Sequence, residues 1–262
     1  MTMYKTKIFL IVVILLSTTN ISQAEENKLG VSLNLDYMSK WMTKGKEGYS
    51  ENGAFFETLN LDFWDTGFGV SVKHISPSGS GFYTGDDVKD KQRLDYSVSY
   101  KNTLFDDHVY QTKHKLSWTY KNYYDQARNE GNVQAWKLKL AWPELLWKGI
   151  QPYYIAHYES PAGSHYHKTP HWSGWVHRFG MEADLDLAQL PKPLYLSSEI
   201  AYTDGLRAAD HDWSYATFGL STKIKMTENL IFFPGLYHQI SMDDSVCERD
   251  VTYCKLSMKW KF

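Results

Sequence analysis

Residues Val251–Phe262 have the sequence VTYCKLSMKWKF and decide the fold class. One alternating set is mostly apolar or weakly polar and contains Thr252, Cys254, Leu256, Met258, Trp260 and Phe262. The other set is mostly polar or cationic and contains Tyr253, Lys255, Ser257, Lys259 and Lys261. Because successive side chains of a strand point to opposite faces, this segment is predicted to be a β-strand with one apolar face and one polar face.

The position of this strand at the end of the chain adds a second indication. An alternating strand that stops on an aromatic residue, here Phe262, resembles the terminal signal of bacterial outer-membrane β-barrels. Such barrels carry apolar side chains outside and polar side chains inside. The resemblance implies two partners, the outer-membrane lipid and the barrel-assembly machinery, which would recognise Phe262.

The N-terminal residues indicate export. Lys5 and Lys7 precede the apolar run Ile8–Leu16, and the small-x-small sequence Ser22-Gln23-Ala24 follows. This run is half as long as the roughly 20 apolar residues that a transmembrane helix needs. We therefore expect a Sec-type signal peptide over residues 1–24 and a single domain, an outer-membrane β-barrel, over residues 25–262.

The composition excludes some classes of partner. Aromatic residues make up 16% of the chain, as in barrels whose rings gather at the two membrane interfaces. The formal net charge is −2, and no basic patch of the kind that binds nucleic acid occurs.

The only cysteines, Cys247 and Cys254, are predicted to form a disulfide in an exported protein.

The alternating pattern predicts an all-β, antiparallel, up-and-down transmembrane barrel of about twelve strands. The expected strands are Leu29–Met42, Phe55–Trp64, Gly67–Ile75, Gln92–Asn102, His108–Lys121, Val133–Trp142, Ile150–Glu159, Trp175–Leu187, Leu194–Thr203, Tyr215–Met226, Leu230–Ser241 and Val251–Phe262. Short and long connections take turns along the chain, which is typical of periplasmic turns and external loops. An even number of strands would put both termini in the periplasm.

Charged residues share the alternate positions opposite the apolar set. Each Lys or Arg on the lipid face would cost about 2–4 kcal/mol at the bilayer midplane, so these residues are expected to line a wet interior. The predicted pore-lining residues are Lys73, Arg93, Lys113, Lys115, Lys137, Lys139, Asp36, Asp62, Glu182, Asp184, Glu199, Lys223, Lys225 and Lys255.

The first six of these residues are expected to form one cationic wall, which would favour anions. Carboxylates are expected to gather on the first, second, eighth and ninth strands and to weaken this preference. Two arrangements stay open: the charges line a narrow conducting pore, or they pair across the lumen and plug it.

Two candidate chemical sites compete with a simple pore. His165, His167 and His171 lie close together in one expected external loop, but nothing there enforces ligand geometry, and no metal site is predicted. His157 and Ser160 could act as the base and the nucleophile of a lipid hydrolase, although residues i and i+3 of a strand point to opposite faces.

The first hairpins resemble a known family. The stretch Leu33–Gly45, a Gly-containing turn, Leu59–Trp64 and the segment Thr66–Val70 are similar to the TorF-like porins. The similarity covers about the first 75 residues after the expected signal peptide, and the chain has Lys44-Gly45 where an Arg-Gly is more typical. The resemblance implies an outer-membrane channel.

These observations together predict a porin-like channel for passive diffusion of small hydrophilic solutes, with a preference for anions. No cofactor and no enzymatic activity are expected, and the location would be the outer membrane of a Gram-negative type cell. A lipid hydrolase and a non-conducting structural or adhesive barrel stay as alternatives.

Overall fold

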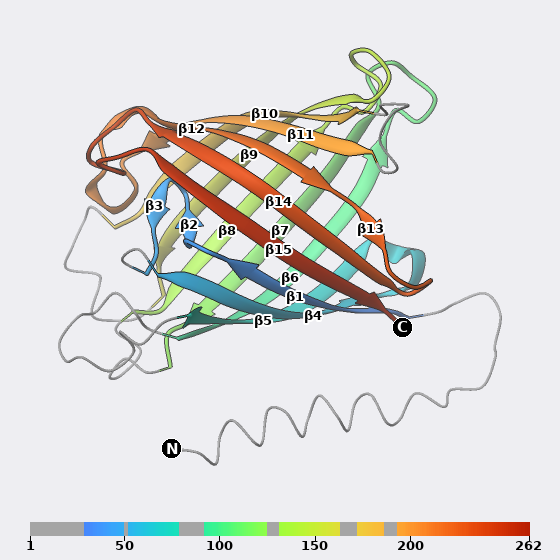
Figure 1. The fold of residues 1–262 in the computed structure, drawn as a ribbon, viewed down its shortest axis with the longest axis horizontal. Helices are drawn as coiled ribbons and strands as arrows, with labels where there is room; N and C mark the ends of the chain where they lie inside the picture. Colours follow the sequence, from blue (N-terminus) through green and yellow to red (C-terminus); the bar gives the residue numbers. More distant parts are fainter. Residues whose placement is uncertain (1–28, 50–51, 79–91, 125–130, 163–171, 186–192) are drawn as a thin grey trace.

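Long antiparallel strands form a closed barrel (Figure 1). The computed structural model describes residues 29–49, 52–78, 92–124, 131–162, 172–185 and 193–262. The predicted signal peptide, residues 1–24, and the loop histidines His165, His167 and His171 lie outside these residues.

Twelve strands make up the wall of the barrel. They are β1 (Gly30–Met38), β4 (Gly53–Asp62), β5 (Phe68–Ser78), β6 (Arg93–Leu104), β7 (Thr112–Asn122), β8 (Val133–Ala141), β9 (Ile150–Pro161), β10 (Gly174–Leu185), β11 (Leu194–Asp204), β12 (His211–Thr222), β14 (Leu230–Ser241) and β15 (Val251–Lys261). Three shorter strands are β2 (Met42–Thr43), β3 (Lys46–Glu47) and β13 (Ile224–Lys225), and two short 3₁₀ turns are η1 (Trp64–Thr66) and η5 (Leu206–Ala208).

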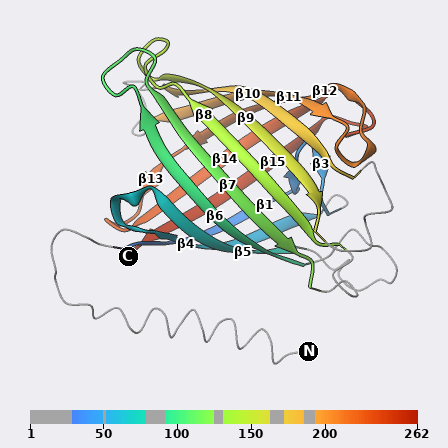
Figure 2. The ribbon, with the colours of Figure 1, turned by 180° about the vertical axis from the view of Figure 1, so that it is seen from behind.

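Each wall strand pairs with the next wall strand along the chain, and the last pairs with the first. The closing seam joins β15 to β1, where Trp260 lies opposite Leu33 and Lys259 lies opposite Asn34. Figure 2 shows the same continuous wall from behind. The prediction of an up-and-down antiparallel barrel with twelve strands is confirmed.

Two predicted strands end earlier than the sequence suggests. The first strand stops at Met38 rather than Met42, and the chain then turns inward through the β2–β3 hairpin. The tenth wall strand, β12, stops at Thr222, and Ile224–Lys225 pairs separately with β14. The start of β12 also contains a bulge, because the β11–β12 register shifts between Ala201 and Tyr202.

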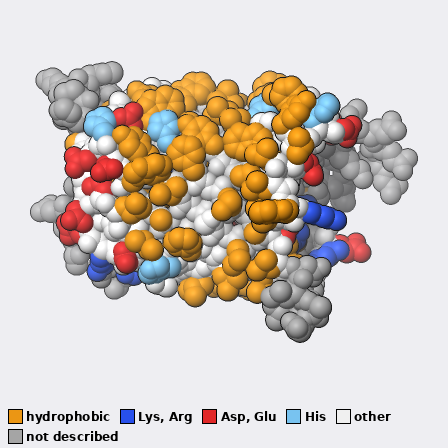
Figure 3. All heavy atoms as spheres, turned by 90° about the horizontal axis from the view of Figure 1, so that it is seen from above, with side chains coloured by type: hydrophobic (Ala, Val, Ile, Leu, Met, Phe, Trp, Pro, Cys, Tyr) orange, Lys and Arg blue, Asp and Glu red, His pale blue; other side chains and the backbone are white. Residues whose placement is uncertain are grey.

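The outward face of the wall is apolar, with aromatic pairs near both ends. Val98, Phe218 and Leu236 expose 48%, 50% and 57% of their surface. Figure 3 shows a broad band of hydrophobic side chains between two ends that carry most of the visible charges. Near one end Tyr158 packs on Trp175, and near the other Trp260 stacks on Phe262. This arrangement is the one that a barrel in lipid needs.

The two ends of the barrel differ, and we name them for what they carry. The terminal end holds the start of β1, the end of β15 and the turn at η1, and the Phe262 amide donates to the Val31 carbonyl there. The hairpin end holds β2 and β3, which lie inside the wall at the opposite end from the C-terminus (Figure 1). Among the described residues, no helix is long and apolar enough to cross a membrane.

The predicted disulfide is absent, because the structure holds Cys247 and Cys254 as free cysteines. Cys254 lies on β15 opposite Leu236 and belongs to the outward-facing set with Leu256. Cys247 lies in the connection before β15 and packs against Val251 and Tyr253, which belong to the inward-facing set. The strand alternation therefore separates the two thiols, and this prediction is corrected.

Candidate functional site

The inward face near the terminal end carries a row of lysines. Lys101 on β6 lies directly opposite Lys115 on β7, which in turn lies opposite Lys139 on β8. Like charges placed directly opposite each other destabilise a sheet, so packing does not explain this row. Two ammonium groups of the row have carboxylates nearby, Lys101 at 3.2 Å from Asp62 and Lys139 at 3.4 Å from Glu182.

These two ion pairs stay accessible to water. The side chains of Lys101 and Asp62 are 55% and 54% exposed, and those of Lys139 and Glu182 are 35% and 49% exposed. Pairs of this kind contribute little to stability. The terminal half of the lumen is thus hydrated, and its fixed charges are available to ions.

Most predicted pore-lining residues occupy the alternate, inward-facing positions of their strands. These are Asp36, Asp62, Lys73, Arg93, Lys113, Lys115, Lys137, Lys139, Glu182, Asp184, Glu199 and Lys255. Lys223 and Lys225 differ because β12 ends before them: Lys223 places its ammonium 6.0 Å from the ring of Phe233, and Lys225 lies in the short strand β13. Both belong to the rim at the terminal end rather than to the wall of β12.

Further inside the lumen, positive and negative side chains pair both within a strand and between strands. Arg178 lies 3.5 Å from Glu199, which also accepts a hydrogen bond from the Tyr153 hydroxyl at 3.0 Å. Arg93 binds Asp95 at 2.6 Å, and Lys73 lies 3.9 Å from the same carboxylate. The predicted cationic wall therefore also contains a carboxylate, Asp95, which pairs with two of its members.

The hairpin end is crossed by the segment between β1 and β4. Lys44 and Gly45 form the tip of the hairpin, with φ values of 52° and 84°, as the two central residues of a type I′ turn require. Trp41 and Tyr49 flank the hairpin, and their ring centroids are 4.4 Å apart. The hairpin is therefore a compact unit rather than an open loop.

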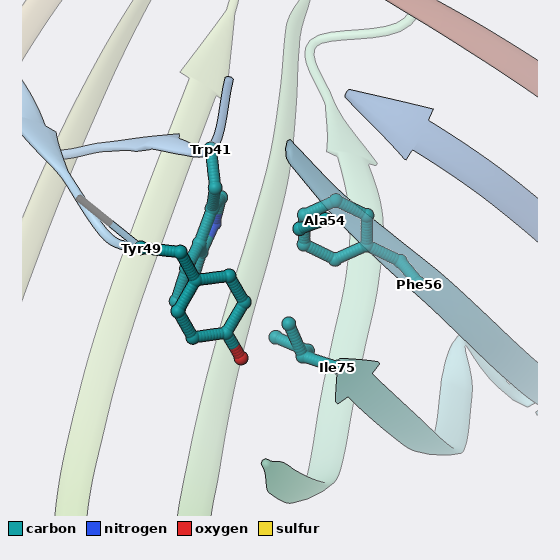
Figure 4. Close-up of a cluster of buried hydrophobic side chains, with 5 residues drawn as sticks. All are labelled: Trp41, Tyr49, Ala54, Phe56 and Ile75. Atoms are coloured by element: carbon teal, nitrogen blue, oxygen red, sulfur yellow. The ribbon is translucent and has the colours of Figure 1, made fainter. Parts of the chain in front are cut away.

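The base of the hairpin is held by apolar packing inside the barrel. Trp41 and Tyr49 form one buried cluster with Ala54, Phe56 and Ile75, which lie on β4 and β5 (Figure 4). The guanidinium of Arg93 also lies 5.2 Å from the centroid of the Trp41 ring.

The tip of the hairpin reaches the far wall. The side-chain amide of Gln239 on β14 donates to the Gly45 carbonyl at 2.7 Å. A Cβ atom on Gly45 would lie 2.4 Å from the Tyr215 ring and 2.7 Å from Val246, so the tip packs without spare room. Beside the tip, the space against β10 and β11 is a cavity of about 10 Å³, enough for roughly one water molecule.

Several cations converge on one carboxylate beside this tip. Glu159 on β9 is 1% exposed and forms ion pairs with Lys44 of the hairpin and with Lys121 of β7. Arg207 of η5 lies 3.4 Å from the same carboxylate, and His157 Nε2 lies 3.2 Å from it. We call Glu159, Lys44, Lys121 and Arg207 the hairpin hub.

Burial affects the lysines of the hairpin, which lie outside the membrane-spanning strands. Desolvation lowers the pKa of Lys44 well below its ordinary value, and the nearby charge of Arg207 lowers it further. The pKa of Lys46 is also lowered, first by desolvation and then by Arg207. The positive charge at the tip is therefore costly and depends on Glu159.

Sequence reasoning did not assign Lys101, Lys121 and Glu159 to the site, although their alternate positions on β6, β7 and β9 gave the signal. Lys44 and Arg207 carried no such signal because they lie in connections. The left-handed φ of Arg207, 57°, is a property of the folded turn.

The two candidate chemical sites fare differently. His157 faces Glu159 inside the barrel, whereas Ser160 pairs with Gln134 through their side chains at 3.2 Å on the opposite face of β9. The two side chains therefore do not form a catalytic pair. Among the described residues, no group of three or more His, Cys, Asp or Glu side chains could hold a metal ion.

Comparison with known proteins supports the fold. No family model and no curated protein matches the chain, so the TorF-like resemblance stays a prediction. The KdgM porin is similar with a TM-score of 0.55 at 10% identity, covering 88% of this chain and 99% of that chain. A structure titled "KdgM porin in complex with disordered oligogalacturonate" gives 0.53 at 9% identity, covering 89% of this chain and 99% of that chain. The chain thus has the fold of outer-membrane porin-type barrels.

Proposed function

We propose that this protein is an outer-membrane channel for passive diffusion of small hydrophilic solutes and that it prefers anions. The observation that carries the proposal is the lysine row Lys101–Lys115–Lys139 on the hydrated face of the terminal half. A fixed cationic row in a narrow tube with low-dielectric walls raises the local concentration of anions. The similar fold of a porin with oligogalacturonate, an acidic sugar chain, is consistent with this preference.

The apolar band and the position of the termini give the channel an orientation. We infer that the terminal end faces the periplasm and that the hairpin end faces the outside, as short turns and long connections indicate. Solute would then meet the hairpin first and the lysine row second. Phe262, at the terminal end, would be the contact for the barrel-assembly machinery, and residues 1–24 would direct export.

A non-conducting barrel is the second candidate, and the hairpin favours it. The tip contacts β9, β12 and β14, so the described part of the hairpin end leaves little free space. A hydrolase that uses His157 and Ser160 has less support, because these side chains lie on opposite faces of β9.

Planar-bilayer recording tests the channel. The purified protein should give discrete conductance steps, and a KCl gradient should give a reversal potential shifted towards the chloride equilibrium potential. The triple variant Lys101→Gln/Lys115→Gln/Lys139→Gln should move this potential towards zero, while Lys148→Gln, an exposed lysine in the turn before β9, should leave it unchanged.

The outcomes separate the candidates. Chloride-shifted conductance that the triple variant weakens supports an anion-preferring channel. Cation selectivity would contradict the role of the lysine row. An absence of conductance in the wild type and in variants with a disrupted hairpin would leave the non-conducting barrel.

A further inference from the structure

The hairpin hub joins four separate parts of the chain at one buried carboxylate. Glu159 belongs to β9, Lys121 to β7, Arg207 to η5 and Lys44 to the tip of the β2–β3 hairpin. The side chains of Lys44, Lys121 and Glu159 are 11%, 8% and 1% exposed. Water therefore contributes little to the stability of these charges.

The hub holds more positive than negative charge. Among the described residues, three cationic side chains share the carboxylate of Glu159, and the Asp95 carboxylate is already bound to Arg93. A buried charge is costly unless it is paired and hydrogen-bonded. The composition of the hub therefore favours a further anionic group close to Lys44 and Arg207.

Lys44 and Arg207 both lie in turns with left-handed backbone conformation. Lys44 has φ 52°, and Arg207 and its neighbour Ala208 have φ 57° and 60°. Left-handed backbone at residues other than glycine is strained and clusters at ligand sites and switches. The two turns thus hold strained residues where they place positive charge at the hairpin end.

The hairpin is attached differently at its two ends. Its base is packed into the apolar cluster of Trp41, Tyr49 and Ile75. Its tip is held by the Lys44–Glu159 ion pair, by a hydrogen bond from Gln239 and by close packing of Gly45 beside Tyr215 and Val246, and Arg249 binds Glu47 of β3. A competing anion would weaken the polar attachment of the tip and leave the apolar base in place. The tip could then move while the base acts as a hinge.

We propose that Lys44 and Arg207 bind an anionic group of the solute, a carboxylate or a similar oxyanion, and that this exchange releases the hairpin tip from Glu159. Glu159 keeps Lys121 as its partner, so each carboxylate in the occupied state has a cation. The inference rests on the proposed channel function and adds a binding site and a gate to it. In the empty state, Glu159 occupies the place of the solute carboxylate.

The first test removes the negative charge of Glu159, which competes with the solute for Lys44 and Arg207. Glu159→Gln keeps the shape of the side chain and removes its charge, so the tip loses its ion pair. In planar bilayers this variant should spend most of its time in the conducting state. Wild-type channels should spend more time in that state when succinate is added on the hairpin side, whereas Glu159→Gln should respond little. The matched control is Glu57→Gln, which removes a carboxylate that binds His74 on the outward face.

The second test keeps the hub intact and fixes the hairpin. Met42 of β2 packs against the cluster that contains Cys247. In a Cys254→Ser background, Met42→Cys should form a disulfide with the native Cys247 on mild oxidation. The oxidised channel should stay closed with or without succinate, and reduction should restore gating. The double variant Met42→Cys/Cys247→Ser should be insensitive to oxidation.

These outcomes distinguish the gate from the channel itself. Wild-type conductance that is unchanged by succinate, by Glu159→Gln and by the oxidised cross-link would overturn the gate and leave the channel. Opening by Glu159→Gln without any response of the wild type to succinate would overturn the solute site. An absence of conductance in every variant would overturn both proposals.

Discussion

The two halves of the lumen use the same kinds of residue in opposite ways. At the hairpin end, Lys121 pairs with Glu159, and the two side chains are only 8% and 1% exposed. The β2–β3 hairpin fills the space between the walls there. At the terminal end, Lys101 pairs with Asp62, and the two side chains are 55% and 54% exposed. Burial decides which charges hold structure together and which set the electric field of the lumen.

The difference follows from desolvation. A buried ion pair loses its hydration, so removing one partner leaves an uncompensated charge at high cost. An exposed pair keeps most of its hydration, and salt screens the attraction between its members. We therefore expect substitutions at the hairpin end to change stability and gating, and substitutions at the terminal end to change ion selectivity.

The largest expected effect comes from removing the carboxylate of the hub. Glu159→Ala leaves Lys44, Lys121 and Arg207 without their shared partner, and the free energy of unfolding should fall by about 3–5 kcal/mol. The matched substitution Asp62→Ala at the terminal end should cost about 0–1 kcal/mol. Urea titration of the barrel refolded in lipid vesicles, followed by tryptophan fluorescence, measures both. Equal losses would mean that the two halves are equally hydrated.

A second effect concerns the apolar base of the hairpin. Trp41→Ala removes the ring that packs on Tyr49 and Phe56, and docking of the hairpin should weaken by about 3 kcal/mol. Hydrogen exchange of residues 41–49 should therefore become faster, while the wall strands stay protected. Trp64→Ala, at an exposed residue of η1, is the control. Unchanged exchange in Trp41→Ala would show that this packing does not hold the hairpin.

The smallest expected effect is on selectivity. Neutralising Lys101, Lys115 and Lys139 together should lower the ratio of chloride to potassium permeability by about twofold or more, because their field raises the local anion concentration. The unfolding free energy should stay nearly unchanged. The reversal potential in a salt gradient measures this ratio, and it should depend on ionic strength. A variant with unaltered selectivity would place the selective step elsewhere.

Much of the wall was predictable from the sequence because lipid imposes a strict rule on it. Each strand must alternate apolar and polar residues, so β15 and its neighbours were recognisable within a few residues. The same alternation also argues against the predicted disulfide. Cys254 points outward with Leu256, whereas Cys247 packs against inward-facing residues.

The hairpin was not predictable in the same way. Residues 39–52 have the composition of an external loop, and Trp41 continues the apolar positions of β1. The inward turn depends on tertiary contacts with Ile75, Gln239 and Glu159, which lie far away in sequence. The hairpin hub likewise depends on the two turns that contain Lys44 and Arg207. No periodic sequence pattern indicates the position of these two turns.

The central claim is that the lumen is closed at the hairpin end and open to water at the terminal end. Rates of thiol modification test it most directly. Single cysteines at Ser99, on the lysine-rich face, and at Thr203, buried beside the hairpin tip, would be compared in a Cys247→Ser/Cys254→Ser background. The reagent would be sulfonatoethyl methanethiosulfonate, which is anionic.

We expect the cysteine at position 99 to react at least about tenfold faster than the one at position 203, because modification follows thiol exposure and local positive charge. Adding Glu159→Gln should raise the rate at position 203 and leave the rate at position 99 unchanged. Equal rates in the wild-type background would contradict a lumen that is closed at one end.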